Sequence, residues 1–306
     1  LSALVPRAQA AQQGDIAQAA RERHAQAAAG QLDLRTAESV ALETLAATPP
    51  PGPETVCRMH LLLATAAQHR SEPDAALGFL DIAARQLVGK PMDDLGAQVA
   101  FARMQAAESR GDLTTATAFA EAAVNAFEQL GMRRRLAQVL NAQGEFLRKQ
   151  GDVNGAVAAY RRAERLFEAL GTAYATVPRI NLGLTLLSTG AFDDAGRTLR
   201  RALGEVRAQG HAGYEYAVRH ALLPVAAASR DRAEFDAHLA SLRALQARGH
   251  FVDGDLATAA EQAGDLWHHA WDHERARLAW GLAEAQWLAL GQADATKRLR
   301  RKRKPR

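Results

Sequence analysis

A turn-forming residue recurs about every forty residues along most of this chain. In the clearest copies an Ala-rich stretch ends at Gly111-Asp112 or Gly151-Asp152, and a second helical stretch with alanine near its start follows. Successive turns lie 41, 40, 40, 39, 40 and 41 residues apart, at Gly30, Ser71, Gly111, Gly151, Gly190, Arg230 and Trp271. So regular a step predicts a repeat array, because two helices and two short loops need about this length.

The residues at these turns suit helix ends. Glycine can end the first helix with a positive φ, and aspartate can cap the second through its carboxylate. Hydrophobic residues make up 48% of the chain but aromatic residues only 6%. A core of alanine, leucine and valine favours closely packed helices over a sheet. The other ends of the helix pairs fall in Gly- or Pro-rich stretches, at 49–53, 89–91, Gly131, Gly171, Gly210 and Gly254.

The pattern inside a copy resembles the tetratricopeptide repeat (TPR) family, in which small residues recur where helices cross. In residues 137–168, Gly144 is the small residue of the first helix, and Ala156, Tyr160 and Ala163 form the small–aromatic–small set of the second. The resemblance covers roughly residues 15–290 and is clearest over 97–205. Comparable sets are Ala64, Ala76, Leu80 and Ala83; Ala116 and Ala123; Gly183, Ala195, Leu199 and Ala202; and Gly264, Ala276, Trp280 and Ala283.

This resemblance implies an all-α, right-handed superhelical solenoid of about six to seven antiparallel helix pairs. We expect a repeat domain over residues 1–296, best defined over 57–290, and a basic, disordered tail at 297–306. The sequence departs from the family pattern in three ways. The step exceeds the usual ~34 residues, residues 1–50 fit poorly, and Pro224 should kink the first helix of its pair.

The longer step and the C-terminal copy resemble a narrower group, the C-terminal repeat regions of large bacterial signalling proteins. In these a serine/threonine kinase or effector domain is joined to an ATPase module and then to TPRs, and maltose-activator-type regulators are related. The first residue is Leu rather than Met, which fits a piece of a longer chain. The leading hypothesis is therefore a cytoplasmic, non-catalytic protein- or peptide-binding scaffold with a regulatory role. The alternative is a repeat domain that senses a small metabolite and reports to an attached ATPase or kinase.

In the TPR family the first helix of each pair lines the inner face, so the resemblance implies a partner-binding groove there. The alternative is that these residues simply face solvent. The groove residues it implies are Gln105, Glu108, Gln138, Asn141, Glu145, Arg148, Lys149 and His220.

No catalytic motif is present, and we expect neither an enzyme nor a cofactor. Gly89-Lys90 is followed by proline and lacks the remaining residues of a phosphate loop, and kinase catalytic-loop and Gly-x-Ser-x-Gly patterns are missing. The single cysteine, Cys57, excludes an intrachain disulfide. No apolar run approaches the ~20 residues that span a bilayer.

Three further features leave alternatives open. Glu261, Asp265 and His269 lie four residues apart on one helix face; they could bind a divalent metal, although a solvated polar face is favoured. Four tryptophans in the last copy could pack in the core or form a partner-binding patch.

The last ten residues carry eight of the 38 basic residues, and the remainder of the chain is acidic, with 30 basic against 34 acidic residues. Nucleic-acid binding is therefore expected only through the tail, if at all.

Overall fold

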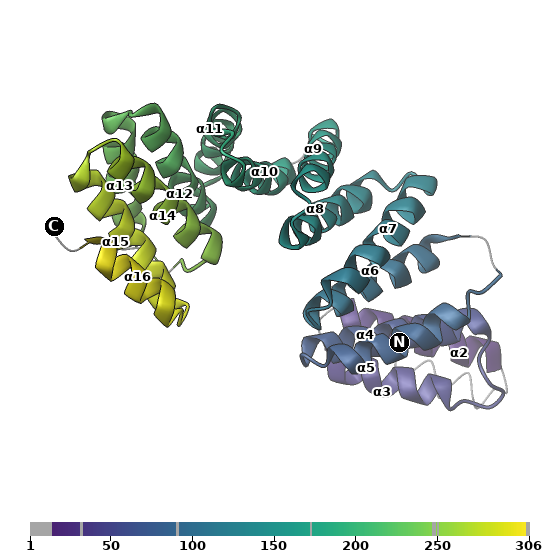
Figure 1. The fold of residues 1–306 in the computed structure, drawn as a ribbon. Helices are drawn as coiled ribbons and strands as arrows, with labels where there is room; N and C mark the ends of the chain where they lie inside the picture. The colour runs from purple at the N-terminus through teal and green to yellow at the C-terminus, as the bar shows by residue number, and fades with distance from the viewer. Residues whose placement is uncertain are drawn as a thin grey trace. The chain divides into compact units, whose positions relative to one another are not determined.

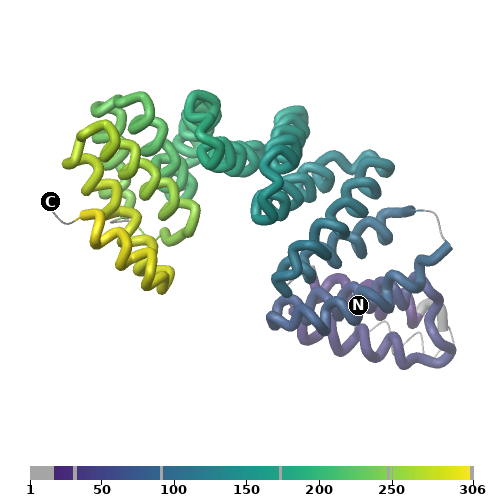
Figure 2. Tube along the Cα trace, viewed as in Figure 1, coloured from purple at the N-terminus to yellow at the C-terminus, as the bar shows by residue number. Residues whose placement is uncertain are grey.

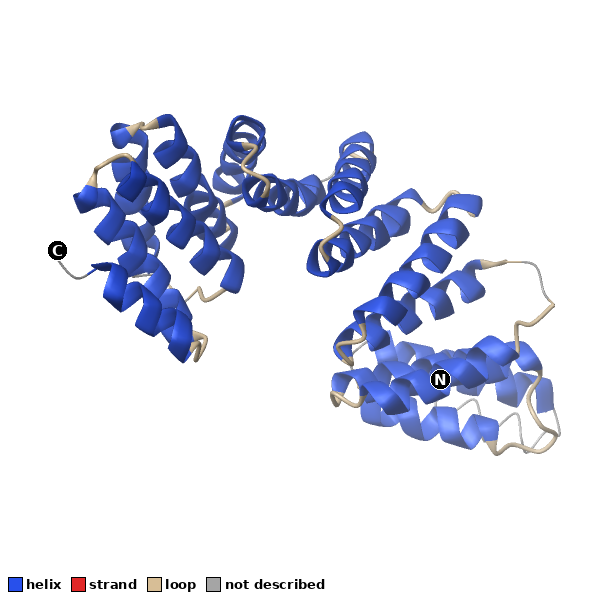
Figure 3. Ribbon diagram, viewed as in Figure 1, coloured by secondary structure: helices blue, strands red, loops and turns tan. Residues whose placement is uncertain are grey.

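The computed structural model describes residues 14–30, 33–89, 92–171, 173–246, 249 and 251–303. Within these residues there are fifteen α-helices, one short 3₁₀ turn and no strand (Figure 3). None of the described helices is long and apolar enough to cross a membrane. The prediction of an all-α repeat protein is confirmed.

The chain forms two compact units, Leu1–Gln150 and Gly151–Arg306. In the first unit, each helix packs against the next one along the chain (Figures 1 and 2). The copy at residues 137–168 is divided between the units, with one helix in each. The helices of the first unit are α2 (Gly14–Gly30), α3 (Leu34–Leu45), α4 (Pro53–His69), α5 (Pro73–Arg85), α6 (Asp94–Ser109), α7 (Leu113–Gln129) and α8 (Arg133–Gln150).

The second unit is also built of antiparallel helix pairs. Here α12 packs against four other helices, α10, α11, α13 and α14. The elements are α9 (Val153–Ala169), η1 (Ala173–Ala175), α10 (Thr176–Ser188), α11 (Phe192–Gln209), α12 (Ala212–Ser229), α13 (Arg232–Gln246), α14 (Gly254–His269), α15 (His273–Ala289) and α16 (Ala293–Arg303).

The turns lie where the spacing predicts them. Six of the seven predicted turn residues, all except Gly30, have φ between 57° and 86°. The aspartates that follow cap the next helix: Asp112 accepts a hydrogen bond from the Thr115 amide at 3.0 Å, and Asp152 accepts one from the Gly155 amide at 2.9 Å. The Gly-Asp pair thus ends one helix and starts the next, as inferred from the sequence.

The small residues of the motif are needed because a large side chain faces them. A Cβ on Gly183 would overlap the Leu199 side chain, and one on Gly264 would overlap the Trp280 ring. In both cases the glycine lies on the first helix and the large residue on the second helix of the same pair. The small–large complementarity therefore sets how closely the two helices approach.

Helix α12 runs through Pro224, with buried residues on both sides of it, so packing against neighbouring helices compensates for the hydrogen bond that proline removes. The structure differs from the sequence expectations at the C-terminus. Residues 297–303, expected to be disordered, form most of α16, and Leu299 is fully buried. Residues 304–306 of the expected tail lie outside the described residues.

Acidic residues of the two preceding helices explain why α16 is ordered. Arg298 binds Glu261 on α14, with nitrogen–oxygen distances of 2.7 and 3.0 Å. Arg300 binds Glu284 on α15 at 2.8 Å, and Arg303 binds the same carboxylate. These acids offset the mutual repulsion of the basic residues, which would otherwise oppose a helix.

Candidate functional site

A cleft of about 410 Å³ lies on the first helices of the first unit. We call it the first-unit groove. Its walls combine aromatic rings with amide side chains: the Phe101 and Phe127 rings lie 6.2 Å apart, and the Arg135 guanidinium lies 5.7 Å from the Phe101 ring. Gln105, one of the predicted groove residues, lines the cleft and is exposed. The lining residues are Leu61, Thr65, Gln68, His69, Gln98, Phe101, Ala102, Gln105, Phe127 and Arg135.

Four of the predicted groove residues form a charged group at the C-terminal ends of α6 and α8. Arg148 donates two hydrogen bonds to Glu145, at 2.8 and 3.1 Å, and the Lys149 ammonium lies 3.3 Å from the same carboxylate. Partial desolvation by neighbouring side chains raises the pKa of Glu108, and the nearby Lys149 ammonium partly offsets this. Glu108 and Gln105 lie three residues apart on α6, so the charged group continues the face that carries the cleft.

The other predicted groove residues separate into two cases. Gln138 and Asn141 are half-buried on α8, and the Gln138 Oε1 atom is buried without a hydrogen bond among the described residues. His220 lies in the second unit and is fully buried, with its ring 4.7 Å from that of Tyr216. A side chain without exposed surface cannot contact a partner, so His220 is not part of a groove. The remaining seven residues stay a prediction.

A larger cleft, of about 660 Å³, lies in the second unit. We call it the second-unit cleft. A buried polar network holds one wall in place: Gln286 donates to the Phe251 carbonyl at 2.9 Å and accepts from the Asp253 amide at 3.0 Å. Nothing in the sequence motif pointed to this cleft. It is lined by Ile180, Asn181, Leu184, Gly210, His211, Ala212, Gly213, Tyr214, Ala217, Phe251, Val252, Asp253, Asp255 and Leu256.

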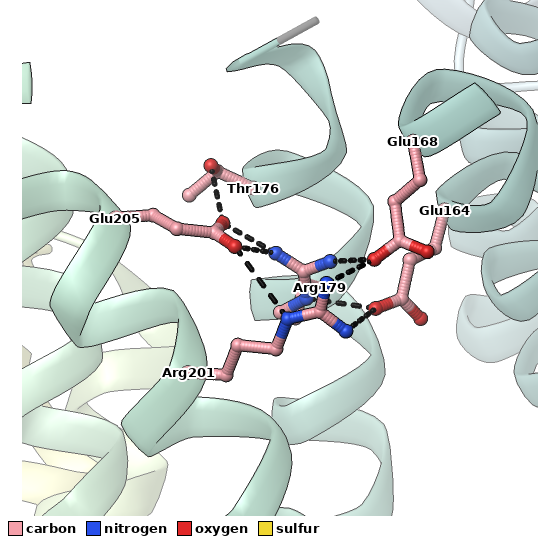
Figure 4. Close-up of polar contacts among 6 residues, drawn as sticks. All are labelled: Glu164, Glu168, Thr176, Arg179, Arg201 and Glu205. Atoms are coloured by element: carbon pink, nitrogen blue, oxygen red, sulfur yellow. Dashed lines mark hydrogen bonds and ion pairs between the residues drawn. The ribbon is translucent and has the colours of Figure 1, made fainter. Parts of the chain in front are cut away.

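One arginine of the second unit is buried among carboxylates. Arg179 on α10 is 1% exposed and donates hydrogen bonds to Glu164 at 2.7 Å and Glu168 at 2.5 Å, both on α9, and to Glu205 on α11. Figure 4 shows its guanidinium between Glu205 on one side and the two α9 glutamates on the other. Arg201 approaches the same carboxylates from α11 but is 59% exposed. The cluster ties three helices together through the buried Arg179 guanidinium.

Two of the three candidate metal ligands, Glu261 and Asp265, bind Lys302 of α16 instead. The Lys302 ammonium lies 3.1 Å from Glu261 and 2.7 Å from Asp265. The Trp280 ring nitrogen also donates to Asp265, and the His269 ring bonds the backbone oxygen of Asp265. Among the residues that the structure describes, no group of acidic, histidine or cysteine side chains is arranged to hold a metal ion. Glu261 and Asp265 therefore help to hold the C-terminal helix α16 in place.

No protein-family model matches the sequence, and no curated protein matches it. Solved structures do match. The Signal Transduction ATPase with Numerous Domains (STAND) protein with a tetratricopeptide repeat sensor from Pyrococcus horikoshii has a TM-score of 0.72 and 12% identity. The alignment covers 94% of this chain and 45% of that chain. More than half of the length of that STAND protein therefore lies outside the alignment.

Two Rap structures match along most of the chain. The apo form of RapI has a TM-score of 0.64 and 9% identity, over 93% of this chain and 98% of its own. A Rap protein complexed with Competence and Sporulation Factor has a TM-score of 0.53 and 14% identity, over 95% of this chain and 78% of its own. Identities this low establish the fold and nothing beyond it. With its antiparallel pairs, its αL turns and these neighbours, the chain is a TPR-like helical repeat protein.

Proposed function

We propose that this chain is a non-catalytic scaffold that binds a protein or peptide partner in the first-unit groove. The observation that carries the proposal is the composition of the groove. Gln68, Gln98 and Gln105 offer amide groups beside the partly exposed Phe101 ring. Amides can pair with a peptide backbone, and the ring can contact an apolar side chain. The charged group formed by Glu108, Glu145, Arg148 and Lys149 extends the same face and suits a segment longer than a single residue.

We further propose that the chain is the regulatory or sensor region of a cytoplasmic bacterial signalling protein, with a kinase or ATPase domain elsewhere in a longer chain. Two of the structural neighbours support this reading. One is a signal transduction ATPase with a TPR sensor, and the other is a Rap protein in complex with a factor. The absence of a catalytic motif in this sequence agrees with a binding role.

Replacing Gln105 and Arg135 together with alanine is expected to reduce partner recovery at least tenfold. A loss of about 1.4 kcal/mol in binding produces this change, and a central contact commonly contributes that much. Recovery is measured by quantitative mass spectrometry after crosslinking to tagged protein in its native cells. The double variant Asn141→Ala/Arg148→Ala tests in the same way whether the partner also contacts α8 beyond the lining of the groove.

Arg85→Ala/Gln129→Ala is the matched control for the groove variants. It removes the same two kinds of side chain from exposed positions on the second helices α5 and α7, and it should keep full recovery. A partner recovered equally from wild type and from both groove variants would exclude the groove as the binding site.

The size of the second-unit cleft favours a second candidate function, the sensing of a small ligand. Its volume of about 660 Å³ lies within the range of small-molecule sites. A ligand at a hundredfold excess over its Kd would stabilise the protein by about 2.7 kcal/mol. We therefore expect a thermal-shift screen of metabolites to yield a compound whose effect is lost in Tyr214→Ala, which removes an exposed ring from the cleft. If every hit shifts both proteins equally, this candidate fails.

A further inference from the structure

One wall of the second-unit cleft is held in place from three helices. The Phe251 ring lies 5.0 Å from the Tyr216 ring on α12, and Gln286 on α15 binds the Phe251 carbonyl. The Tyr216 hydroxyl accepts hydrogen bonds from Gln286 at 3.2 Å and from Gln246 on α13 at 2.9 Å. The wall is therefore preformed, which lowers the cost of binding a ligand against it.

Apolar side chains beside this wall remain in contact with water. Tyr214 and Val252 line the cleft and are 44% and 45% exposed. Leu184 on α10 and Ala217 on α12 are half-buried in the same lining. A ligand with an apolar or aromatic body would remove these surfaces from water, and that burial favours binding.

The acidic side chains of the cleft have no basic counterpart in its lining. Asp253 and Asp255 line the cleft, and none of the lining residues is lysine or arginine. Asp253 caps α14 by accepting hydrogen bonds from the amides of Asp255 and Leu256, at 2.7 and 3.3 Å. It forms no ion pair with a described residue. Because these amides are uncharged, the capping bonds leave a full negative charge on Asp253.

The N-termini of two helices also meet the cleft. Ala212 and Asp255 lie in the first turns of α12 and α14 and belong to its lining. A helix N-terminus favours an anion, but it is equivalent to only about half a positive charge. The formal charge of two carboxylates outweighs two such termini. Aromatic ring faces attract cations as well, and Tyr214 and Phe251 supply two rings.

We propose, building on the small-ligand function of the second-unit cleft, that its ligand is an organic cation, an ammonium ion carried on an apolar or aromatic body. The body packs against Tyr214 and Val252, and the ammonium faces Asp253. The volume of about 660 Å³ accommodates such a molecule. Carboxylate and phosphate ligands are disfavoured, because the lining offers them no lysine or arginine.

A set of probes that differ only in charge tests the proposal on the purified full chain. Tryptamine, tryptophol and indole-3-propionate carry an ammonium, a hydroxyl and a carboxylate on the same indole body. We expect tryptamine to bind about fivefold more tightly than tryptophol, and indole-3-propionate more weakly than either. Calorimetry gives each Kd. Added salt should weaken the binding of tryptamine and leave that of tryptophol unchanged, because screening acts on charge.

Asp253→Asn separates the charge of this residue from its structural role. Asparagine caps a helix as well as aspartate does, so the variant should keep the wild-type Tm and bind tryptamine about fivefold more weakly. Its affinity for tryptophol should not change. Asp231→Asn is the matched control. Asp231 caps α13 through the Glu234 amide at 2.9 Å and lies outside the cleft lining, so this variant should bind tryptamine like wild type.

The cation is overturned if tryptophol or indole-3-propionate binds as tightly as tryptamine, if none of the three probes binds, or if Asp253→Asn binds tryptamine as tightly as wild type. None of these results refutes the small-ligand function itself. That function fails separately, if every hit of the metabolite screen shifts wild type and Tyr214→Ala equally. An anionic hit that is lost in Tyr214→Ala would support the ligand function and overturn the cation.

Discussion

Arg179→Ala is expected to lower the free energy of unfolding by about 3 kcal/mol. The substitution removes the buried guanidinium that binds Glu164, Glu168 and Glu205 and leaves only the exposed Arg201 to offset their repulsion. Removing one partner of a buried ion pair commonly costs 3–5 kcal/mol. We take the lower end because the glutamates are 16–35% exposed and can turn partly toward water. Urea denaturation followed by circular dichroism gives the value.

Arg201→Ala is the matched control, because it removes the same charge from the same cluster. Arg201 is 59% exposed, and exposed ion pairs contribute about 0–1 kcal/mol. Arg179→Lys should fall between the two, since an ammonium cannot reach three carboxylates with the geometry of a guanidinium. Equal losses for Arg179→Ala and Arg201→Ala would show that burial of Arg179 does not strengthen the cluster.

The parts of the fold that depend on local chemistry could be predicted from the sequence. The turns at Gly111-Asp112 and Gly151-Asp152 follow from glycine and aspartate, whose preference for αL backbone and for helix caps acts within a few residues. The small–large sets could also be recognised, since 3.6-residue periodicity puts Ala156, Tyr160 and Ala163 on one face. All three are fully buried.

Contacts between distant charges could not be predicted. Arg298 binds Glu261 across 37 positions, and Arg300 binds Glu284 across 16. The sequence alone shows only a run of like charges, which favours disorder. Which carboxylates meet Arg179 likewise depends on the packing of three helices, and no local pattern around the residue contains that information.

The placement of the candidate groove was predictable only in part. The resemblance to the TPR family puts Gln105 and Glu108 on the first helix of a pair, and both are exposed there. The same reasoning failed for His220, because α12 packs against four neighbouring helices and has ten buried residues in eighteen. A helix enclosed in this way has few positions left for a partner, and its mostly apolar sequence was the available signal.

Acidification is expected to destabilise the second unit through His220. Burial lowers the pKa of this imidazole from 6.5 to about 4, an effect that the Leu256 backbone offsets only in part. Neither ring nitrogen makes a hydrogen bond of normal geometry among the described residues. Above pH 6.5 the ring is neutral in both the folded and the unfolded chain, so it contributes no pH dependence there. Below pH 6.5 the unfolded chain binds a proton that the folded chain excludes, and stability falls until about pH 4, by about 3 kcal/mol in all.

The contribution of His220 is isolated by comparing His220→Leu with wild type, because other groups also titrate over this range. His238 is one of them, since burial lowers its pKa too. Denaturation measured between pH 6.5 and 4 should show a shallower loss of stability for His220→Leu, whatever its stability at neutral pH. His211→Leu makes the same change on an exposed side chain of the same unit and is measured alongside as the control for the loss of an imidazole. If stability falls equally with pH in His220→Leu and in wild type, the buried ring accepts its proton in the folded chain. Water would then reach the core around α12.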